Sequence, residues 1–428
     1  MARRPDRARS YREDRPVNKE FPGGRIAPPP WLVEPPTQAL LAALGRAGIA
    51  ARFVGGAVRD TLLGRPVGDL DLATPARPEQ VLEALNEAGI RAVPTGLEHG
   101  TVTAIVPPRV FEITTLRRDV ETDGRHARVA FDADWAADAA RRDFTINAIF
   151  LDPDGTLHDP VGGLADLRAH RVRFVGDAAR RIAEDVLRLL RYYRFEARFG
   201  DGGGDPAARA ACRSAVPLLA ALSAERVAHE LTRLLQAPDP VPVLRMMQED
   251  GVLAAILPEA TRLDRLECLL RLEPDRDALR RLAALISVDA AGAAAVAARL
   301  RFSNAWRDRL VGLAAPFPLD PAACARQQRL ALYRLGTDRY RDLALLSAAQ
   351  GATSSARLSE LLHDAEGWTP PVFPLRGQDV TALGVAPGPP VGRLLEAVRN
   401  WWEEGDFAAD RAACLARLGH LAERGRAG

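Results

Sequence analysis

The sequence predicts an α+β protein with a mixed sheet in its N-terminal part and only helices after it. Two observations carry this prediction. Between residues 52 and 158, short apolar and β-branched runs alternate with Gly, Asp and Pro turns, which is typical of strands. From about residue 177, Leu, Ala and Arg recur at helical spacing and β-branched runs nearly vanish. At 47% hydrophobic and 27% charged residues, the 428-residue chain is expected to fold around several cores.

The predicted elements of the N-terminal part follow in order. Residues 36–49, PTQALLAALGRAGI, have the apolar spacing of a helix that ends at a glycine. Four strand-like runs follow: RFVGG, GDLDLAT, GTVTAIV and VFEITTL. The helical pattern PEQVLEALNEAG lies between the second and third runs, and INAIFLDPDGTLHDP indicates a hairpin around an Asp-Gly turn. Further on, DGGGDPA and APDP are expected to separate helices.

Composition excludes several classes of protein. The net charge is only +2, yet the positive residues are nearly all arginine, so a local phosphate-binding face is compatible with it. Residues 1–30 are charged and lack an apolar core, so we expect a disordered basic arm rather than a signal peptide. No apolar run approaches the length of a membrane helix. Four scattered cysteines form no CxxC pattern, which predicts no zinc site and a reducing, cytoplasmic location.

The stretch GGAVRDTLLGRPVGDLD, residues 55–71, predicts a phosphate and cation site. Asp69 and Asp71 are two apart, so a strand would direct both carboxylates to the same face. Mg²⁺, which prefers oxygen ligands, is the cation that we expect to bind there. The Gly55-Gly56 pair before a helix is by itself only a tight turn, but beside two aspartates it predicts a phosphate cradle. Arg59, one helical turn later, is expected on the phosphate side.

Two further segments contain candidates that have an ordinary structural alternative. In VFEITTLR, Glu112 is either a third carboxylate at the cation or a solvent-facing strand residue, depending on which strand lies beside it. In ARRDFTINA, residues 140–148, Arg142 either meets a triphosphate with Asp143 orienting it, or belongs to a salt-bridged surface turn.

The segment EDVLRLLRYYRF, residues 184–195, repeats a charged group every three residues. Asp185, Arg188, Arg191 and Arg194 would form one stripe if a single helix carries them all. Such a stripe is either a solvated face or a ligand-binding face. A carboxylate and a guanidinium together can read the edge of a base, and two more arginines can hold phosphates.

These motifs in this order resemble the class II CCA-adding enzymes, the tRNA nucleotidyltransferase and bacterial poly(A) polymerase family. GGAVRD, GDLDLAT, RRDFTINA, DPVGGLADLRAHRVRFVGD and EDVLRLLRYYRF carry the resemblance, which covers roughly residues 50–260 well. It implies a palm-type nucleotidyltransferase head followed by an all-helical neck, body and tail. The implied bounds are 31–176 for the head, 177–238 for the neck with its nucleobase-selecting helix, 239–370 for the RNA-binding body and 371–428 for the RNA-binding tail.

The resemblance also implies roles for single residues. Asp69 and Asp71 would bind Mg²⁺ and act in catalysis, with Glu112 where a third carboxylate falls. The residues implied to contact the nucleotide are Gly56, Arg59, Arg142, Asp185, Arg188, Arg191 and Arg194. Asp185 and Arg188 would pair with the incoming base, so that protein replaces a nucleic-acid template.

The implied reaction is addition of CCA to the 3′ end of tRNA from CTP and ATP, with release of pyrophosphate. Residues 116–135 resemble a flexible loop that CC-adding relatives lack, which argues against addition of CC alone. An A-adding enzyme or a poly(A) polymerase of the same family stays open as an alternative. So does a non-catalytic RNA-binding protein on this fold, although the paired aspartates disfavour it. The sequence does not indicate an oligomeric state.

Overall fold

A computed structural model describes residues 24–96, 100–123, 126–314 and 319–427 of the chain. The chain divides into two compact units at Pro258. The first unit contains the predicted head and neck, and the second contains most of the predicted body and the whole tail. The predicted bounds of the arm, head, neck, body and tail stay predictions, and residues 1–23 of the predicted arm lie outside the described residues.

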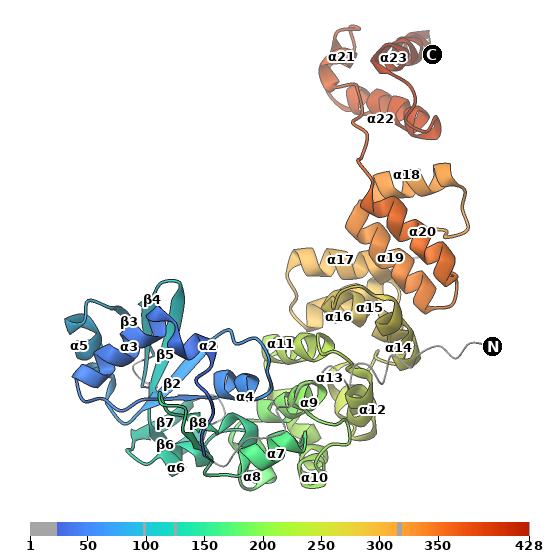
Figure 1. Cartoon of the computed structure of the whole chain (residues 1–428). Coiled ribbons are helices and arrows are strands. Elements are labelled where there is room, and N and C mark those ends of the chain that lie inside the picture. Colours follow the sequence, from blue (N-terminus) through green and yellow to red (C-terminus); the bar gives the residue numbers. More distant parts are fainter. Residues whose placement is uncertain (1–23, 97–99, 124–125, 315–318, 428) are drawn as a thin grey trace. The chain divides into compact units, whose positions relative to one another are not determined.

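A seven-stranded mixed sheet forms the centre of the head (Figure 1). Its order is β3-β4-β5-β2-β1-β8-β9. β2 and β5 are parallel, and all other neighbouring strands are antiparallel. The strands are β1 Arg52–Val54, β2 Leu70–Thr74, β3 Arg91–Gly96, β4 Thr101–Val106, β5 Arg109–Thr115, β8 Phe150–Leu151 and β9 Leu157–His158.

The sheet confirms the four predicted strands and the hairpin, and adds one strand that the sequence did not indicate. β3, RAVPTG, contains a proline and lacks regular alternation. It pairs only with β4, at the edge of the sheet, where a proline is tolerated because one side of the strand needs no partner.

Short helices cover the sheet. α3 Pro35–Arg46 and α5 Pro78–Glu87 pack on each other and on β4, and they confirm the two predicted helices of this part. α4 Gly56–Leu62 packs on β1 and β2. Further helices of the head are α2 Pro30–Val33, α6 Trp135–Ala140 and the 3₁₀ helix Thr145–Asn147.

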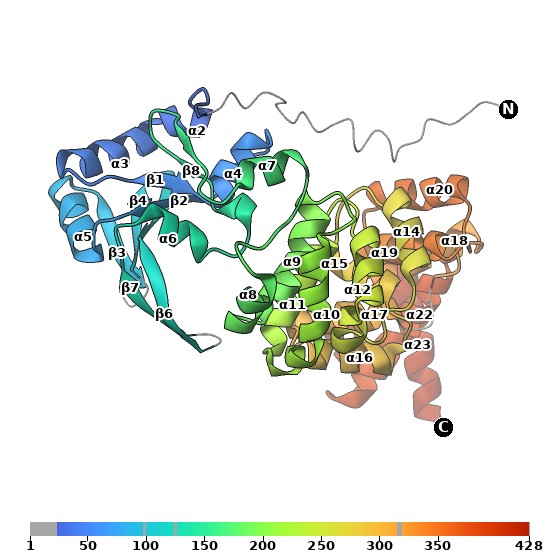
Figure 2. The same ribbon diagram turned by 90° about the horizontal axis from the view of Figure 1, so that it is seen from below.

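Residues 117–131 form a separate antiparallel ribbon of β6 Arg117–Asp123 and β7 His126–Phe131. Figure 2 shows the two strands side by side, next to the main sheet. The segment that resembles a flexible loop is therefore a β-hairpin in its described residues.

The rest of the first unit is helical. Its helices are α7 Gly163–Arg168, α8 Ala178–Glu184, α9 Leu187–Phe199, α10 Pro206–Ala215, α11 Ala224–Leu235, α12 Val241–Glu249 and α13 Val252–Ile256, with a 3₁₀ helix at Val216–Ala221. α9 packs against α8, α10, α11 and α12, and its aromatic residues are buried. The predicted breaks DGGGDPA and APDP separate α9 from α10 and α11 from α12.

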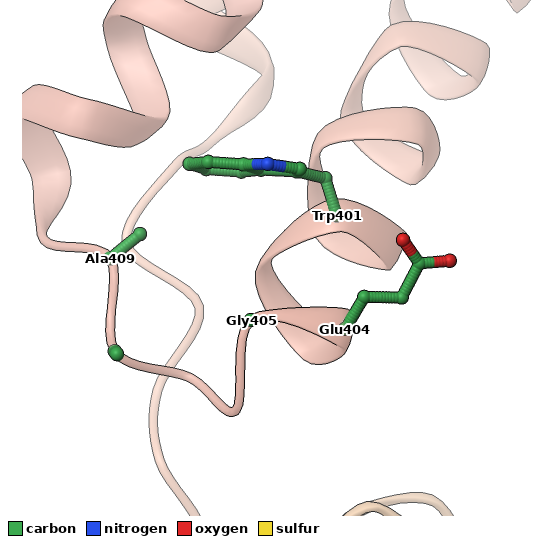
Figure 3. Close-up of a pocket in the computed structure, with 5 residues that line it drawn as sticks. Trp401, Glu404, Gly405 and Ala409 are labelled. Carbon is green, nitrogen blue, oxygen red and sulfur yellow. The ribbon is translucent and has the colours of Figure 1, made fainter.

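The second unit contains helices only, within its described residues. They are α14 Leu263–Leu272, α15 Ala278–Leu285, α16 Ala290–Arg299, α17 Asn304–Ala314, α18 Ala325–Leu335, α19 Thr337–Ala349, α20 Ser355–Glu366, α21 Gly377–Thr381, α22 Pro389–Glu404 and α23 Arg411–Ala427. A core that includes Val380, Val398 and Trp402 joins the last three helices. Beside it, the ring of Trp401 lies over a pocket of about 460 Å³ (Figure 3). None of the described helices is both long and apolar enough to span a bilayer.

Candidate functional site

Two carboxylates lie side by side at the middle of the sheet. β2 pairs with β5 in parallel, and the register places Asp71 directly opposite Glu112. Paired residues on neighbouring strands are about 4.8 Å apart and point to the same face. Their chain neighbours Leu70, Leu72 and Phe111 are buried on the other face, which leaves Asp71 half-buried and Glu112 exposed.

Asp69 lies just outside this strand. β2 begins at Leu70, so the strand that we expected to carry both aspartates contains only Asp71, and Asp69 is an exposed residue directly before it. The side chain of Asp69 is still close enough to act electrostatically on Asp71.

The environment of Asp71 favours a cation. Burial raises the pKa of Asp71 to about 6, and the negative charges of Glu112 and Asp69 act in the same direction, while Arg142 opposes them. Among the described residues, no three His, Cys, Asp or Glu side chains already form a closed metal cage. An open set of carboxylates fits Mg²⁺, which is usually held by one or two carboxylates, water and substrate phosphates.

The glycine turn lies against these charges. Gly55 has φ +75°, which favours glycine, and a Cβ added there would lie 3.7 Å from Asp71 Oδ2 and 4.0 Å from Arg142 Nη1. The turn therefore brings the backbone close to one carboxylate and one guanidinium. Gly56 begins α4 directly after it.

Arg59 is buried rather than open to solvent. Its Nε and Nη2 donate to the two carboxylate oxygens of Asp60, both at 3.0 Å, and Nη1 donates to Asn147 Oδ1 at 2.6 Å. The guanidinium also stacks over the ring of Phe199 at 4.0 Å. In this conformation Arg59 connects the glycine turn to the RRDFTINA segment and to α9, and its contact with a nucleotide stays a prediction.

Arg142 is oriented by a residue that the sequence analysis missed. Its Nε and Nη2 donate to Asp138 Oδ2 at 3.1 and 2.8 Å, and Arg141 donates to Asp138 Oδ1. Asp138, three and four residues earlier on α6, is buried. The spacing of i to i+3 and i+4 was a signal for these ion pairs.

The expectation that Asp143 orients Arg142 is wrong. Asp143 accepts from Arg191 Nε and Nη2 at 2.9 and 2.5 Å and from Asn147 Nδ2 at 3.0 Å. Burial alone would raise the pKa of Asp143, but Arg191 and these hydrogen bonds hold it below its usual value. Asp143 therefore joins the head to the neck, because Arg191 lies on α9.

The expectation of one continuous helix through Asp185 is also wrong. α8 ends at Glu184, Asp185 has an extended backbone with φ −153°, and α9 begins at Leu187. Asp185 Oδ1 accepts from Leu187 N at 3.0 Å, so its side chain caps α9. Aspartate stabilises the start of a helix better than its interior. The three-residue spacing therefore predicted one continuous helix where Asp185 in fact precedes a new one.

The arginine stripe lies on α9 and is not a solvated face. Arg188 Nη1 donates to Glu184 Oε2 at 2.5 Å, Arg191 pairs with Asp143, and Arg194 is buried with its Nε 2.5 Å from Glu230 Oε2. Asp185 lies at the start of the stripe, and Arg226 Nη2 donates to its Oδ1 at 3.0 Å and its Oδ2 at 2.7 Å. Each charged group of the stripe thus has a partner from another segment.

Comparisons with known proteins identify the family of this chain. Residues 51–173 match the model of the poly A polymerase head domain, and residues 205–263 match that of a probable RNA- and SrmB-binding site of polymerase A. The mitochondrial CCA tRNA nucleotidyltransferase 1 of Mus musculus is 35% identical over 380 residues, which are 86% of each chain. This chain belongs to the CCA tRNA nucleotidyltransferase family.

Bacterial members of the family are also similar. The CCA-adding enzyme of Geobacillus stearothermophilus is 39% identical over 231 residues, 53% of this chain and 56% of that one. The crystal structure of the Bacillus stearothermophilus CCA-adding enzyme in complex with CTP matches 92% of this chain and 99% of that chain, with a TM-score of 0.75 and 30% identity. The Thermotoga maritima CCA-adding enzyme complexed with tRNA, at 20% identity over 91% of this chain and 96% of that one and a TM-score of 0.60, shares the fold.

Proposed function

We propose that this chain adds CCA to the 3′ end of tRNA from CTP and ATP without a nucleic-acid template. The observation that carries the proposal is the in-register pair of Asp71 and Glu112, with the Gly55 turn and Arg142 close to Asp71. Acidic groups, a close backbone approach and a guanidinium at one place are what transfer of a nucleotidyl group from a triphosphate requires.

The reaction joins the 3′ oxygen of the RNA to the α-phosphorus and breaks the bond to the pyrophosphate, which leaves. Asp69 and Asp71 would hold Mg²⁺, with Glu112 as a further carboxylate. When bound, Mg²⁺ would lower the pKa of the 3′ hydroxyl and neutralise charge on the phosphates. The glycine turn admits the triphosphate to within contact of the backbone, and Arg142 balances its negative charge.

Base selection is assigned to Asp185 and Arg188. Cytosine and adenine both present an amino group beside a ring-nitrogen acceptor, whereas uracil and guanine present a carbonyl beside an N–H. Arg226 holds the Asp185 carboxylate while leaving it lone pairs, and Glu184 binds Arg188 only through Nη1. A carboxylate and a guanidinium edge are thus held in place for an amino donor and a ring acceptor.

RNA binding by the body and tail and a cytoplasmic location are parts of the proposal that rest on the sequence. The mouse and human relatives carry "mitochondrial" in their names, so these relatives do not support the cytoplasmic part of the proposal.

The test is incorporation of labelled nucleotide into tRNA that ends before CCA, with all four triphosphates present. The expected product is three nucleotides longer, ends in CCA and requires Mg²⁺, so that EDTA abolishes it. A long A tail would instead identify a poly(A) polymerase, and a single added A an A-adding enzyme. Absence of any incorporation by protein that binds tRNA would favour the non-catalytic alternative.

A further inference from the structure

We infer that Asp138 is a positioning residue that aims Arg142 at the triphosphate and keeps it away from the carboxylates of the cation site. The inference deepens the proposed function and rests on it. Asp138 touches neither the glycine turn nor Asp71 in any described contact, so it acts through Arg142.

The geometry at Asp138 is that of a fixed anchor. Its side chain is 1% exposed, and one carboxylate receives four nitrogen contacts of 2.5–3.1 Å from Arg141 and Arg142. Two guanidinium groups outweigh the cost of burying this carboxylate, so the pKa of Asp138 is held below its usual value although burial alone would raise it. A buried anion of this kind stays charged and defines a direction for both cations.

The anchor leaves one end of Arg142 available. Nε and Nη2 are held by Asp138, whereas Nη1 has no hydrogen-bond partner among the described residues. Nη1 is also the atom that lies 4.0 Å from the place where Gly55 would carry a Cβ. The two protons of Nη1 are therefore presented at the turn that the triphosphate approaches.

Arg142 has a competing partner in Asp71. Asp71 Oδ2 and Arg142 Nη1 lie 3.7 and 4.0 Å from the same point, which is the position of a Cβ added to Gly55. Without Asp138, the attraction between Arg142 and Asp71 would have no opposing anchor, and the arginine would pair with a ligand of the cation.

The backbone beneath Arg142 is held separately. Arg181 of α8 donates through Nη2 to the carbonyl oxygens of Arg141 and Arg142, the latter at 2.7 Å. Loss of Asp138 is therefore expected to release the side chain of Arg142 while its main chain stays in place.

The test compares Asp138→Asn with wild type in CTP incorporation on tRNA ending before CCA. We expect KM for CTP to rise about tenfold, as for loss of a charge-assisted contact, with kcat changed less. The Mg²⁺ concentration for half-maximal rate should rise as well, because Arg142 then competes at Asp71. In the double variant Asp138→Asn with Arg142→Ala, the Mg²⁺ requirement should return towards wild type, and KM should be no higher than in Arg142→Ala alone.

Asp250→Asn is the matched control. Asp250 is likewise 1% exposed in its side chain and is shared by two arginines, Arg209 and Arg213, but it lies at the end of α12, in the predicted body. The Asp250→Asn variant should have a lower melting temperature than wild type, with an unchanged KM for CTP and an unchanged Mg²⁺ requirement.

The inference is overturned if Asp138→Asn behaves like Asp250→Asn. It is also overturned if the fold-increase in KM of the double variant equals the product of the fold-increases in Asp138→Asn and Arg142→Ala. If Asp138→Asn does not fold, Asp138→Glu keeps the charge but moves it by one methylene, and an unchanged KM in that variant overturns the inference equally. An inactive wild-type protein would instead refute the proposed function.

Discussion

The carboxylates of the head and those of the neck are arranged in opposite ways. In the head, Asp71 and Glu112 lie side by side, and Arg142, the cation that acts on Asp71, is already held by Asp138. In the neck, Glu184 and Glu230 each pair with an arginine at 2.5 Å. The head therefore has an excess of negative charge that a metal ion can balance, whereas Glu184 and Glu230 of the neck are already balanced by arginines.

The difference indicates how each region recognises its ligand. A site with excess charge gains most when a counter-ion arrives. A site of paired charges gains little from charge, but it holds donors and acceptors in fixed directions, which is what discrimination between bases needs. The head is thus suited to neutralisation and the neck to selection.

The largest effect is expected for Asp71→Ala in the head. Removal of the half-buried carboxylate leaves Asp69 and Glu112 without the group between them, and incorporation should fall by about a thousandfold or more, because the metal and its charge stabilisation are lost. Binding of tRNA, measured by filter retention, should change little.

Glu112→Gln is the companion variant for that prediction. A large loss in Glu112→Gln identifies Glu112 as a ligand, and activity within about twofold of wild type identifies it as a strand residue at the rim. Substantial Mg²⁺-dependent activity in Asp71→Ala would show that the cation lies elsewhere.

Arg188→Ala should relax selection in the neck. Without the Arg188 guanidinium, a mispaired base no longer costs the roughly 1–3 kcal/mol of an unpaired group. Incorporation of UTP relative to CTP should therefore rise about 5- to 140-fold, while the overall rate falls. Single-nucleotide incorporation with each triphosphate measures the ratio. Arg191→Ala, which removes the partner of Asp143, should lower the rate and keep the wild-type ratio of UTP to CTP incorporation. If Arg188→Ala shows the same ratio as Arg191→Ala, the base is selected by other residues.

Replacing residues 119–130 by a short glycine linker should impair A addition more than C addition. The replaced segment forms most of the β6–β7 ribbon and resembles the loop that CC-adding relatives lack. Separate rates for CTP and ATP on tRNA ending before CCA and after CC measure the difference. Equal loss of both rates, together with a lower melting temperature, would indicate a purely structural ribbon.

The smallest effect on catalysis is expected for Glu196→Gln, which tests the one unpaired carboxylate of α9. Burial raises the pKa of Glu196 to about 7; Oε1 accepts from the amides of Gly202 and Gly204, and Oε2 has no partner. Because the folded pKa lies above the unfolded value, the fold is penalised progressively as pH rises from about 4.5 to about 7, by roughly 3 kcal/mol at most.

Glu196→Gln should therefore unfold at higher denaturant concentration than wild type at pH 8 and at a similar one near pH 4.5. Parallel denaturation curves at the two pH values measure this difference. A wild-type curve that shows the same pH dependence as the variant would contradict the assignment.

Much of the fold was predictable because local patterns and tertiary structure agree. The helix over 36–49, the strands around Asp71 and Glu112, and the breaks at DGGGDPA and APDP all follow from spacing and turn residues. β3 was not predictable in this way, because a proline-containing edge strand has neither the alternation nor the burial of the others. The prediction of a single helix through Asp185 was wrong because the three-residue spacing of charges continues across the start of α9.

For the site, the sequence alone determined which chemistry is present: paired aspartates after a glycine turn, an Arg-Arg-Asp segment, and a repeat of acidic and basic groups. Those groups recur at short spacing, where local geometry already limits what they can do. Only the tertiary structure decided the partners: Glu112 beside Asp71, Asp138 rather than Asp143 on Arg142, and Arg226 on Asp185. Strand order and ion pairs between segments depend on which surfaces pack together, and spacing along one segment carries no information about that packing.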